Sequence, residues 1–179
     1  MEKSNIVLIG FMGVGKTSIG KKLADIYQRE FIDTDREIEK LTGMTVSQIF
    51  ARHGEIRFRS EENLIVTKVA ARSNCVISTG GGAVIDPENI KALQANGILI
   101  CLTADPQVIQ ERVSKRGGRP LLQKDRSIER IVQLLKEREP FYAEADFTVD
   151  TTHLSQEETI ERIRVFLEER GFSCGNPAC

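Results

Sequence analysis

The chain has 179 residues, of which 40% are hydrophobic and 28% are charged, the composition of one globular domain with a substantial core. Its 25 Lys and Arg residues nearly balance its 26 Asp and Glu residues, so the formal net charge of −1 excludes a general attraction to nucleic acid or to anionic membranes. Four scattered cysteines are too few for a disulfide framework, and no apolar run reaches the roughly 18 residues that a membrane span needs. We therefore expect a cytoplasmic protein with no nucleic-acid partner and no membrane partner.

Short apolar runs alternate with helical patterns along the chain. The runs predict strands at residues 6–9, 30–32, 76–78, 98–102 and 147–149. The patterns between them predict helices at residues 18–27, 36–41, 46–53, 55–71, 87–94, 106–115, 127–145 and 155–170. Aspartates directly before Pro87 and Pro106 mark two of the helix starts. Strands separated by helices predict an α/β fold with a parallel sheet covered on both faces. We expect one domain over residues 1–172 and a flexible tail over 173–179.

The stretch GFMGVGKT at residues 10–17 joins the first predicted strand to the first predicted helix. Gly10, Gly15, Lys16 and Thr17 fit the pattern G-x-x-x-x-G-K-[ST]. Glycines let the backbone aim N–H groups at a phosphate, the helix start adds a positive dipole end, and Lys16 adds a full charge. Thr17 can offer its hydroxyl to Mg²⁺. The alternative is a glycine-rich turn that matches by chance, but the strand before it and the helix after it favour binding of a nucleoside triphosphate.

Three classes of protein carry such a loop: switch GTPases, motor or regulatory ATPases, and small-molecule kinases. The sequence holds neither the N/T-K-x-D motif nor the D-x-x-G motif of a GTPase. The third predicted strand runs from Cys75 to Ser78 and continues into Thr79 and a run of glycines, without the acidic residue that usually ends the corresponding strand of a motor ATPase. The metal ligand must therefore lie elsewhere, and a small-molecule kinase is favoured.

The second predicted strand ends in Asp33-Thr34-Asp35. The two carboxylates are spaced i, i+2, so in an extended chain they point the same way, toward the crevice at the strand ends. One can support Mg²⁺, and the other can orient or deprotonate a substrate hydroxyl. The alternative is that Thr34 to Glu37 form a capping box that merely starts a helix. Capping accounts for Thr34 and Glu37 but not for Asp33, which favours the functional interpretation.

Arginines offer a way to bind a substrate carboxylate, because the guanidinium fork matches a carboxylate bidentately. Arg57 and Arg59 lie on opposite sides of Phe58, and Arg138 precedes Pro140 by two residues near the end of a long helical pattern. The alternative is surface ion pairing with neighbouring glutamates, namely Glu61, Glu137 and Glu139. Spacing alone does not choose between these interpretations.

Residues 112–126, RVSKRGGRPLLQKDR, hold six basic residues and one acidic residue around two glycines. This composition is typical of a mobile basic lid that closes over a triphosphate, excludes water and brings an arginine to the transferred phosphoryl group. A solvated loop or a small nucleic-acid patch is the alternative, and neither explains the two glycines that interrupt the basic run.

The motifs GFMGVGKT, DTD, FR, STGGG and RPLL, taken together, resemble those of the shikimate kinase family in order and spacing, from Ile6 to about Arg170. The resemblance implies a three-layer α/β/α P-loop fold like that of nucleoside monophosphate kinases, with a five-stranded parallel sheet. A substrate-binding region at residues 34–61 and a lid at 112–126 are implied as well. It also implies ATP-dependent phosphorylation of the 3-hydroxyl of shikimate, with Mg²⁺, on the route to chorismate and aromatic amino acids, by a monomer.

The resemblance assigns a set of residues to the nucleotide. The residues implied to hold the ATP phosphates are Gly13, Val14, Gly15, Lys16, Thr17 and Ser18. Thr17 and Asp33 would organise Mg²⁺, and Lys16 would also act in catalysis. Arg119 of the RPLL motif would be the catalytic lid arginine on the phosphates, and Arg112 would pack on the adenine.

A second set is implied for shikimate. Asp35 would bind the substrate hydroxyls and act as the base. The FR motif selects Arg59 over Arg57 as the residue that holds the shikimate carboxylate, with Arg138 as its partner. Gly80, Gly81 and Gly82 would lend backbone N–H groups to the substrate and to the γ-phosphate region.

The chain also departs from the family pattern. Family members often carry arginine or proline after the last strand, near the adenine, whereas this chain has a segment that contains His153, which we expect to face solvent. Cys174 and Cys179 match no family motif, and without further ligands they do not indicate a metal site.

The sequence leaves two alternative functions: a kinase of similar build, such as a gluconate kinase, and a nucleotide sensor without catalysis. The joint FR and RPLL pattern disfavours the first, and the intact acceptor residues disfavour the second.

Overall fold

The computed structural model describes residues 3–114, 125 and 127–173. Most of the predicted lid, including Arg119, and most of the predicted tail, including Cys174 and Cys179, therefore lie outside the described residues. The described elements are β1 (Asn5–Gly10), α1 (Lys16–Tyr27), β2 (Glu30–Asp33), α2 (Thr34–Thr42), α3 (Val46–Ala70), β3 (Cys75–Ser78), the short 3₁₀ helix η1 (Ala83–Ile85), α4 (Pro87–Asn96), β4 (Gly97–Thr103), α5 (Pro106–Ser114), α6 (Ile128–Tyr142), β5 (Phe147–Asp150) and α7 (Gln156–Glu169).

The strands form one five-stranded sheet in the order β2-β3-β1-β4-β5, and every described pair is parallel. The predicted α/β class and parallel sheet are confirmed, and all the predicted strands are present. The register aligns Asp33 with Ser78 and Gly10 with Leu102, so the strands end together at one edge. In an open parallel sheet this carboxyl edge is where ligands bind.

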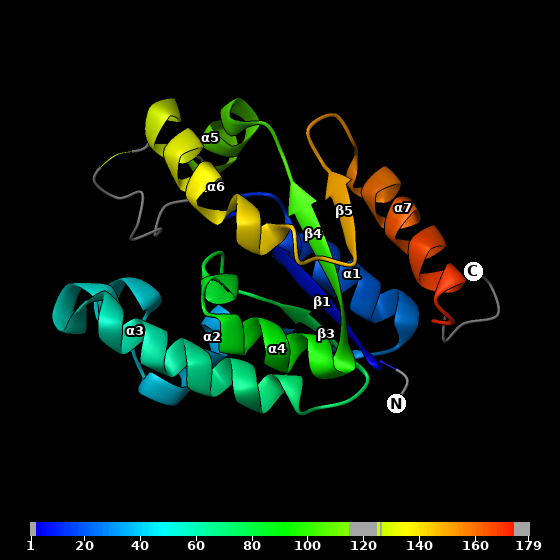
Figure 1. Ribbon diagram of the computed structural model, residues 1–179, viewed down its shortest axis with the longest axis horizontal. Coiled ribbons are helices and arrows are strands. Elements are labelled where there is room, and N and C mark those ends of the chain that lie inside the picture. The colour runs from blue at the N-terminus through cyan, green and yellow to red at the C-terminus, as the bar shows by residue number, and fades with distance from the viewer. Residues whose placement is uncertain (1–2, 115–124, 126, 174–179) are drawn as a thin grey trace.

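Helices cover both faces of the sheet (Figure 1). Helices α1 and α7 contact each other on one face, whereas α3 and α4 contact each other on the other. The direction of the crossovers places α1 on the face opposite α3 and α4, because right-handed connections that run toward opposite edges of a sheet place their helices on opposite faces. Helix α7 follows the last strand and packs beside α1. The substrate-binding region predicted at residues 34–61 corresponds to α2 and the first part of α3.

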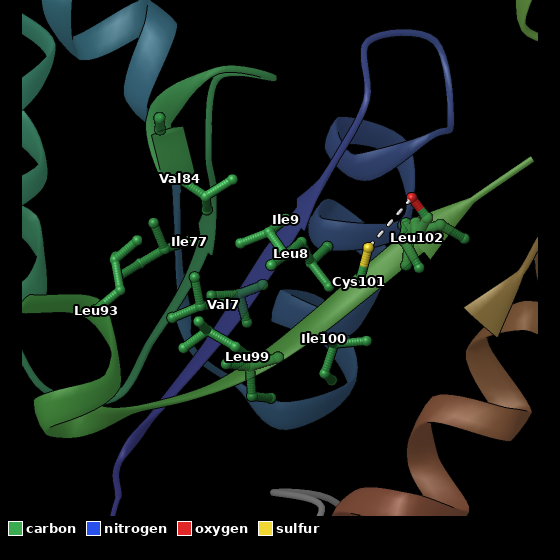
Figure 2. Close-up of a cluster of buried hydrophobic side chains, with 14 of the residues drawn as sticks. Val7, Leu8, Ile9, Ile77, Val84, Leu93, Leu99, Ile100, Cys101 and Leu102 are labelled. Carbon is green, nitrogen blue, oxygen red and sulfur yellow. Dashed lines mark hydrogen bonds between the residues drawn. The ribbon is translucent and has the colours of Figure 1, made fainter. Parts of the chain in front are cut away.

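The core lies between the central strands and the helices. All residues of β1 and β3 are buried, as expected for continuous apolar runs inside a parallel sheet. Figure 2 shows side chains of β1, β3 and β4 meeting Val84 of η1 and Leu93 of α4. No described helix contains an apolar stretch long enough to cross a lipid bilayer.

Helix α3 contains a break that the sequence pattern predicts as a boundary between two helices. Gly54 has φ 79° and ψ 177°, although the residues on both sides are helical. This region of backbone space is essentially restricted to glycine. The predicted boundary between two helices is therefore confirmed as a break at Gly54 within α3, and Arg59 lies just beyond that bend.

The end of β1 demands glycine for a different reason. Gly10 has φ 128°, and a β-carbon built on it would lie 2.2 Å from the backbone oxygen of Leu102. Gly43 after α2 also has a positive φ, of 66°, but no atom lies within 4 Å of its built β-carbon. The turn into the phosphate loop thus depends on a close approach between the backbones of β1 and β4.

We expect Gly10→Ala to lower the free energy of unfolding by roughly 3 kcal/mol or more, because backbone strain and a backbone clash add. Gly43→Ala, the matched control, should lower it by about 1 kcal/mol, because it has strain alone. Urea unfolding followed by circular dichroism measures both. Equal losses would contradict the importance of the contact with Leu102.

Candidate active site

The predicted phosphate loop connects β1 to α1 at the carboxyl edge of the sheet. Gly13 and Gly15 have positive φ angles of 85° and 107°, which turn the backbone tightly before the helix. Gly15 caps α1 without a side-chain hydrogen bond, so no side chain satisfies the first N–H groups of the helix at this position. A helix start of this kind favours an anion.

Lys16 is the first residue of α1, directly after this loop, and is buried. Its Nζ donates hydrogen bonds to the carbonyl oxygens of Gly10, at 2.7 Å, and Phe11, at 2.9 Å. The ammonium group is therefore held against the backbone of the loop that precedes it. This arrangement places a full positive charge beside the helix start, as the motif predicts.

Asp33 has two contacts that together correct the interpretation of the DTD motif. Its Oδ2 accepts a hydrogen bond of 2.9 Å from Thr17 Oγ1. Its Oδ1 accepts one of 3.4 Å from the backbone N–H of Arg36 and caps α2. The prediction that capping involves Thr34 rather than Asp33 is wrong, because the helix begins one residue earlier than a Thr34 cap requires.

Asp35 lies in the first turn of α2, so the prediction that it extends the strand beside Asp33 is also wrong. The helix turns its carboxylate toward the loop after β3, where a β-carbon built on Gly80 would lie 2.7 Å from Asp35 Oδ1. The same β-carbon would lie 2.8 Å from Glu62 Oε1. Thr34 fixes this loop, since its Oγ1 accepts a hydrogen bond of 2.9 Å from the Gly80 N–H. The two carboxylates therefore converge on a residue that has no room for a side chain.

Arg59 is held by two carboxylates of its own helix. Its Nη1 donates to Glu62 Oε2 at 2.6 Å, and its Nη2 and Nε donate to Glu55 Oε1 at 3.0 and 3.3 Å. A β-carbon built on Gly82 would lie 2.7 Å from both Nη atoms, so the guanidinium also packs on the glycine loop. Burial lowers the pKa of Arg59, but the attraction and hydrogen bond of Glu62, with those of Glu55, outweigh it and raise that pKa. Arg59 is a fixed cation.

Glu62 is buried, and a charged carboxylate is unusual in a buried position. Burial raises the pKa of Glu62, the Arg59 guanidinium opposes this shift, and the nearby Asp35 carboxylate adds to it. Among the described residues, its Oε1 has no hydrogen-bond partner. Glu62 was missed in the sequence, although its spacing of i, i+3 from Arg59 on a helix is visible there.

Arg138 approaches the glycine loop from α6. It is only 3% exposed, and its Nη1 donates a hydrogen bond of 3.1 Å to the carbonyl oxygen of Gly81. Tyr142, one turn later, donates to the same oxygen at 2.8 Å, a contact that the sequence does not indicate. The guanidinium also lies over the ring of Phe11, 5.2 Å from its centre. Arg138 is therefore fixed between the phosphate loop and the glycine loop.

These side chains line one pocket. Asp35, Arg59, Glu62, Arg138 and the loop 80–82 supply its polar surface. Its apolar walls are Met12, Val46, Phe50 and Phe58. Arg57 lies elsewhere: it pairs with Glu61 and borders an outer groove between α2 and α3. Surface ion pairing, the alternative interpretation, therefore holds for Arg57.

A second cavity, of about 310 Å³, adjoins the phosphate loop. Gly13, Val14, Gly15 and Ser18 line one side of it, and Arg112, Thr151 and Leu154 line another. Arg112 donates hydrogen bonds of 3.1 Å to both the side-chain oxygen and the carbonyl oxygen of Thr151. His153 is exposed, as expected, and does not line this cavity. Of the residues predicted for the nucleotide, Gly13, Val14, Gly15, Ser18 and Arg112 therefore line one cavity, whereas Arg119 lies outside the described part of the chain.

Comparisons with known proteins agree with this geometry. A family model described as shikimate kinase matches residues 12–168. A shikimate kinase of Pelotomaculum thermopropionicum is 57% identical over 168 residues, which cover 94% of this chain and 98% of that protein. A shikimate kinase of Desulforudis audaxviator is 50% identical and covers 94% of this chain and 88% of the relative.

A solved structure extends the likeness to three dimensions. Shikimate kinase from Acinetobacter baumannii in complex with shikimate superposes with a TM-score of 0.90 at 34% identity, over 95% of this chain and 96% of that one. The family model and the relatives each cover most of the chain, and so does the superposition. The chain belongs to the shikimate kinase family.

Proposed function

We propose that this chain transfers the γ-phosphoryl group of ATP to the 3-hydroxyl of shikimate, giving shikimate 3-phosphate and ADP. The observation that carries the proposal is the single pocket in which Asp35, Arg59 and Arg138 surround the glycine loop 80–82, next to the phosphate loop. We further propose that the enzyme works as a monomer, as the family resemblance implies, and in the cytoplasm. Its balanced charge supports the absence of a nucleic-acid or membrane partner.

The phosphate loop would bind the triphosphate. The backbone N–H groups of residues 13–18 and the start of α1 offer hydrogen bonds and a positive dipole end. Lys16 would exchange its contacts with the carbonyl oxygens of Gly10 and Phe11 for contacts with phosphate oxygens. The cavity beside the loop would take the adenine, between Arg112 and the segment after β5.

Thr17 and Asp33 fit a magnesium site. Their hydrogen bond already places a hydroxyl oxygen beside a carboxylate oxygen, which are the hard donors that Mg²⁺ prefers. The described part of the chain holds no group of three or more His, Cys, Asp or Glu side chains that could bind a metal ion by themselves. This donor set suits an ion that takes only one or two protein ligands and completes its shell with water and phosphate. Bound there, Mg²⁺ would neutralise charge on the phosphate oxygens.

Asp35 would orient the attacking hydroxyl and accept its proton. Its Oδ1 lies over Gly80, where the substrate can approach the backbone closely because no side chain intervenes. Glu62 approaches the same β-carbon position of Gly80 and would fix Arg59 rather than touch the phosphate. Oδ1 of Asp35 is a buried atom, and exclusion of water there would favour proton transfer to Asp35 over exchange with bulk water.

Arg59 and Arg138 would hold the carboxylate of shikimate. They approach the glycine loop from different helices, α3 and α6, and both are fixed by hydrogen bonds before substrate arrives. Preorganised charged donors lose little entropy on binding, which favours selection of an anionic acceptor. Arg119 remains our proposal for the lid arginine that stabilises charge on the transferred group.

The test of this function is ADP release by the purified protein with MgATP and one acceptor at a time. We expect ADP production that depends on shikimate, and little with quinate, gluconate, a nucleoside monophosphate or no acceptor. Turnover with gluconate instead would retain the phosphoryl-transfer chemistry but reject the carboxylate assignment. ATP binding without turnover on any acceptor would favour a nucleotide sensor.

We expect Asp35→Asn to lower kcat by about 10²-fold to 10⁴-fold, the usual contribution of a positioned general base. ATP affinity should stay near that of the unmodified protein, because Asp35 faces the acceptor pocket. Glu37→Gln is the matched control, since Glu37 is an acid on the same helix that pairs with Lys40. Steady-state kinetics and calorimetric titration of ATP measure the effects. An undiminished kcat for Asp35→Asn would reject the base role.

We expect Arg59→Ala to weaken shikimate binding about tenfold to a hundredfold, because charged hydrogen bonds worth about 1.5–3 kcal/mol are lost. Arg57→Ala removes the same charge two residues away, from a side chain that is 63% exposed and paired with Glu61. It should change shikimate affinity less than twofold, as expected for an exposed ion pair outside the pocket. Calorimetry gives both dissociation constants, and equal weakening by the two variants would contradict the assignment.

A further inference from the structure

One edge of the Arg59 guanidinium, which could bind the carboxylate of a ligand, already binds a carboxylate of the protein, that of Glu55. Nε and Nη2 form one side of the guanidinium fork, and both donate to Glu55 Oε1, at 3.3 and 3.0 Å. The fork binds carboxylates bidentately through pairs of parallel N–H groups. Glu55 therefore occupies the position that an incoming carboxylate would take on this side of Arg59.

The two glutamates that contact Arg59 differ in their surroundings. The side chain of Glu62 is 2% exposed, so water could not solvate its carboxylate if a ligand displaced it from Arg59. The side chain of Glu55 is 53% exposed. Releasing Glu55 into water costs little, because an exposed ion pair contributes little free energy. Of the two carboxylates, Glu55 is the one that a ligand can replace.

The backbone at Glu55 also favours movement. Glu55 directly follows Gly54, whose φ of 79° and ψ of 177° interrupt α3. No atom lies within 4 Å of a β-carbon built on Gly54, and the next residue, Ile56, is 86% exposed. Glu55 thus sits at a bend with open space around it, whereas Glu62 lies two turns further into the packed part of the helix.

We propose that Glu55 is a built-in competitor of the substrate carboxylate: it occupies Arg59 while the pocket is empty and is displaced into solvent when shikimate binds. The inference rests on the proposed function, in which Arg59 binds the carboxylate of shikimate. Replacing one carboxylate by another keeps the charge around Arg59 constant. The empty pocket therefore keeps its arginine neutralised and oriented, and shikimate binds more weakly than it would to a vacant fork.

Glu55→Gln tests this inference. Removing the competing charge should tighten shikimate binding about twofold to fivefold, the range expected for release of an exposed ion pair. The change should appear in the shikimate dissociation constant and KM, and the KM for ATP should not change. Glu161→Gln is the control for net charge, because Glu161 is similarly exposed and pairs with Arg164 on α7, across the sheet. It should leave shikimate affinity as it is.

The methyl ester of shikimate distinguishes competition from a general effect of charge. It lacks the anionic carboxylate, so Glu55→Gln should not tighten its binding. Unchanged or weaker shikimate binding by Glu55→Gln, or equal tightening of acid and ester, would overturn the inference while leaving the proposed function intact. Failure of the unmodified protein to bind shikimate would instead reject the proposed function itself.

Discussion

The parallel pairing of β1 between β3 and β4 determines where the phosphate loop and the glycine loop lie. Because the register brings the ends of the strands to one edge, the segments that follow them have to share that edge. The phosphate loop follows β1, and the glycine loop 80–82 follows β3. Asp33 ends β2, the neighbour of β3, and reaches Thr17 at the start of α1. A change of register at β1 would separate the phosphate loop from the acceptor pocket, although the motifs themselves would be intact.

The glycine loop 80–82 is the place where the charged groups meet. Carboxylates from α2 and α3 approach Gly80, the guanidinium of Arg59 approaches Gly82, and Arg138 donates to the carbonyl oxygen of Gly81. Side chains at Gly80 or Gly82 would occupy the positions of these charged atoms. Three consecutive glycines offer no functional side chain, yet this lack of side chains lets opposite charges from three helices lie around one short segment.

The amino-acid sequence predicts the local features of this site well and the long-range features less well. The phosphate loop is predictable because its function depends on the spacing of Gly10, Gly15 and Lys16 within one turn. The partners of Arg59 are harder to predict, because the bend at Gly54 determines which way each side chain of the following helix points. In the structure Arg57 pairs with Glu61 and Arg59 pairs with Glu62. The sequence does not predict that Asp33 caps α2, because the same carboxylate also binds Thr17. The spacing of the capping box assigns the cap to Thr34 and leaves only the second role for Asp33. The contact of Tyr142 with Gly81 joins residues 61 positions apart and leaves no local pattern.

The balance of charge in the pocket explains how a site with two arginines can remain stable when it is empty. Among the side chains that line the pocket, Arg59 and Arg138 are matched by Asp35 and Glu62, so these four carry no net charge when all are ionised. The exposed Glu55 adds a further carboxylate to Arg59 while the pocket is empty. An excess of positive charge would attract any anion and would cost free energy in a buried setting. With the charges balanced, recognition of an anionic acceptor depends on the direction of individual N–H groups rather than on the field of the pocket. Under the proposed assignment such a site would select by geometry: a planar carboxylate held by the arginines would leave a hydroxyl group within reach of Asp35, and an acceptor of another shape would not satisfy both.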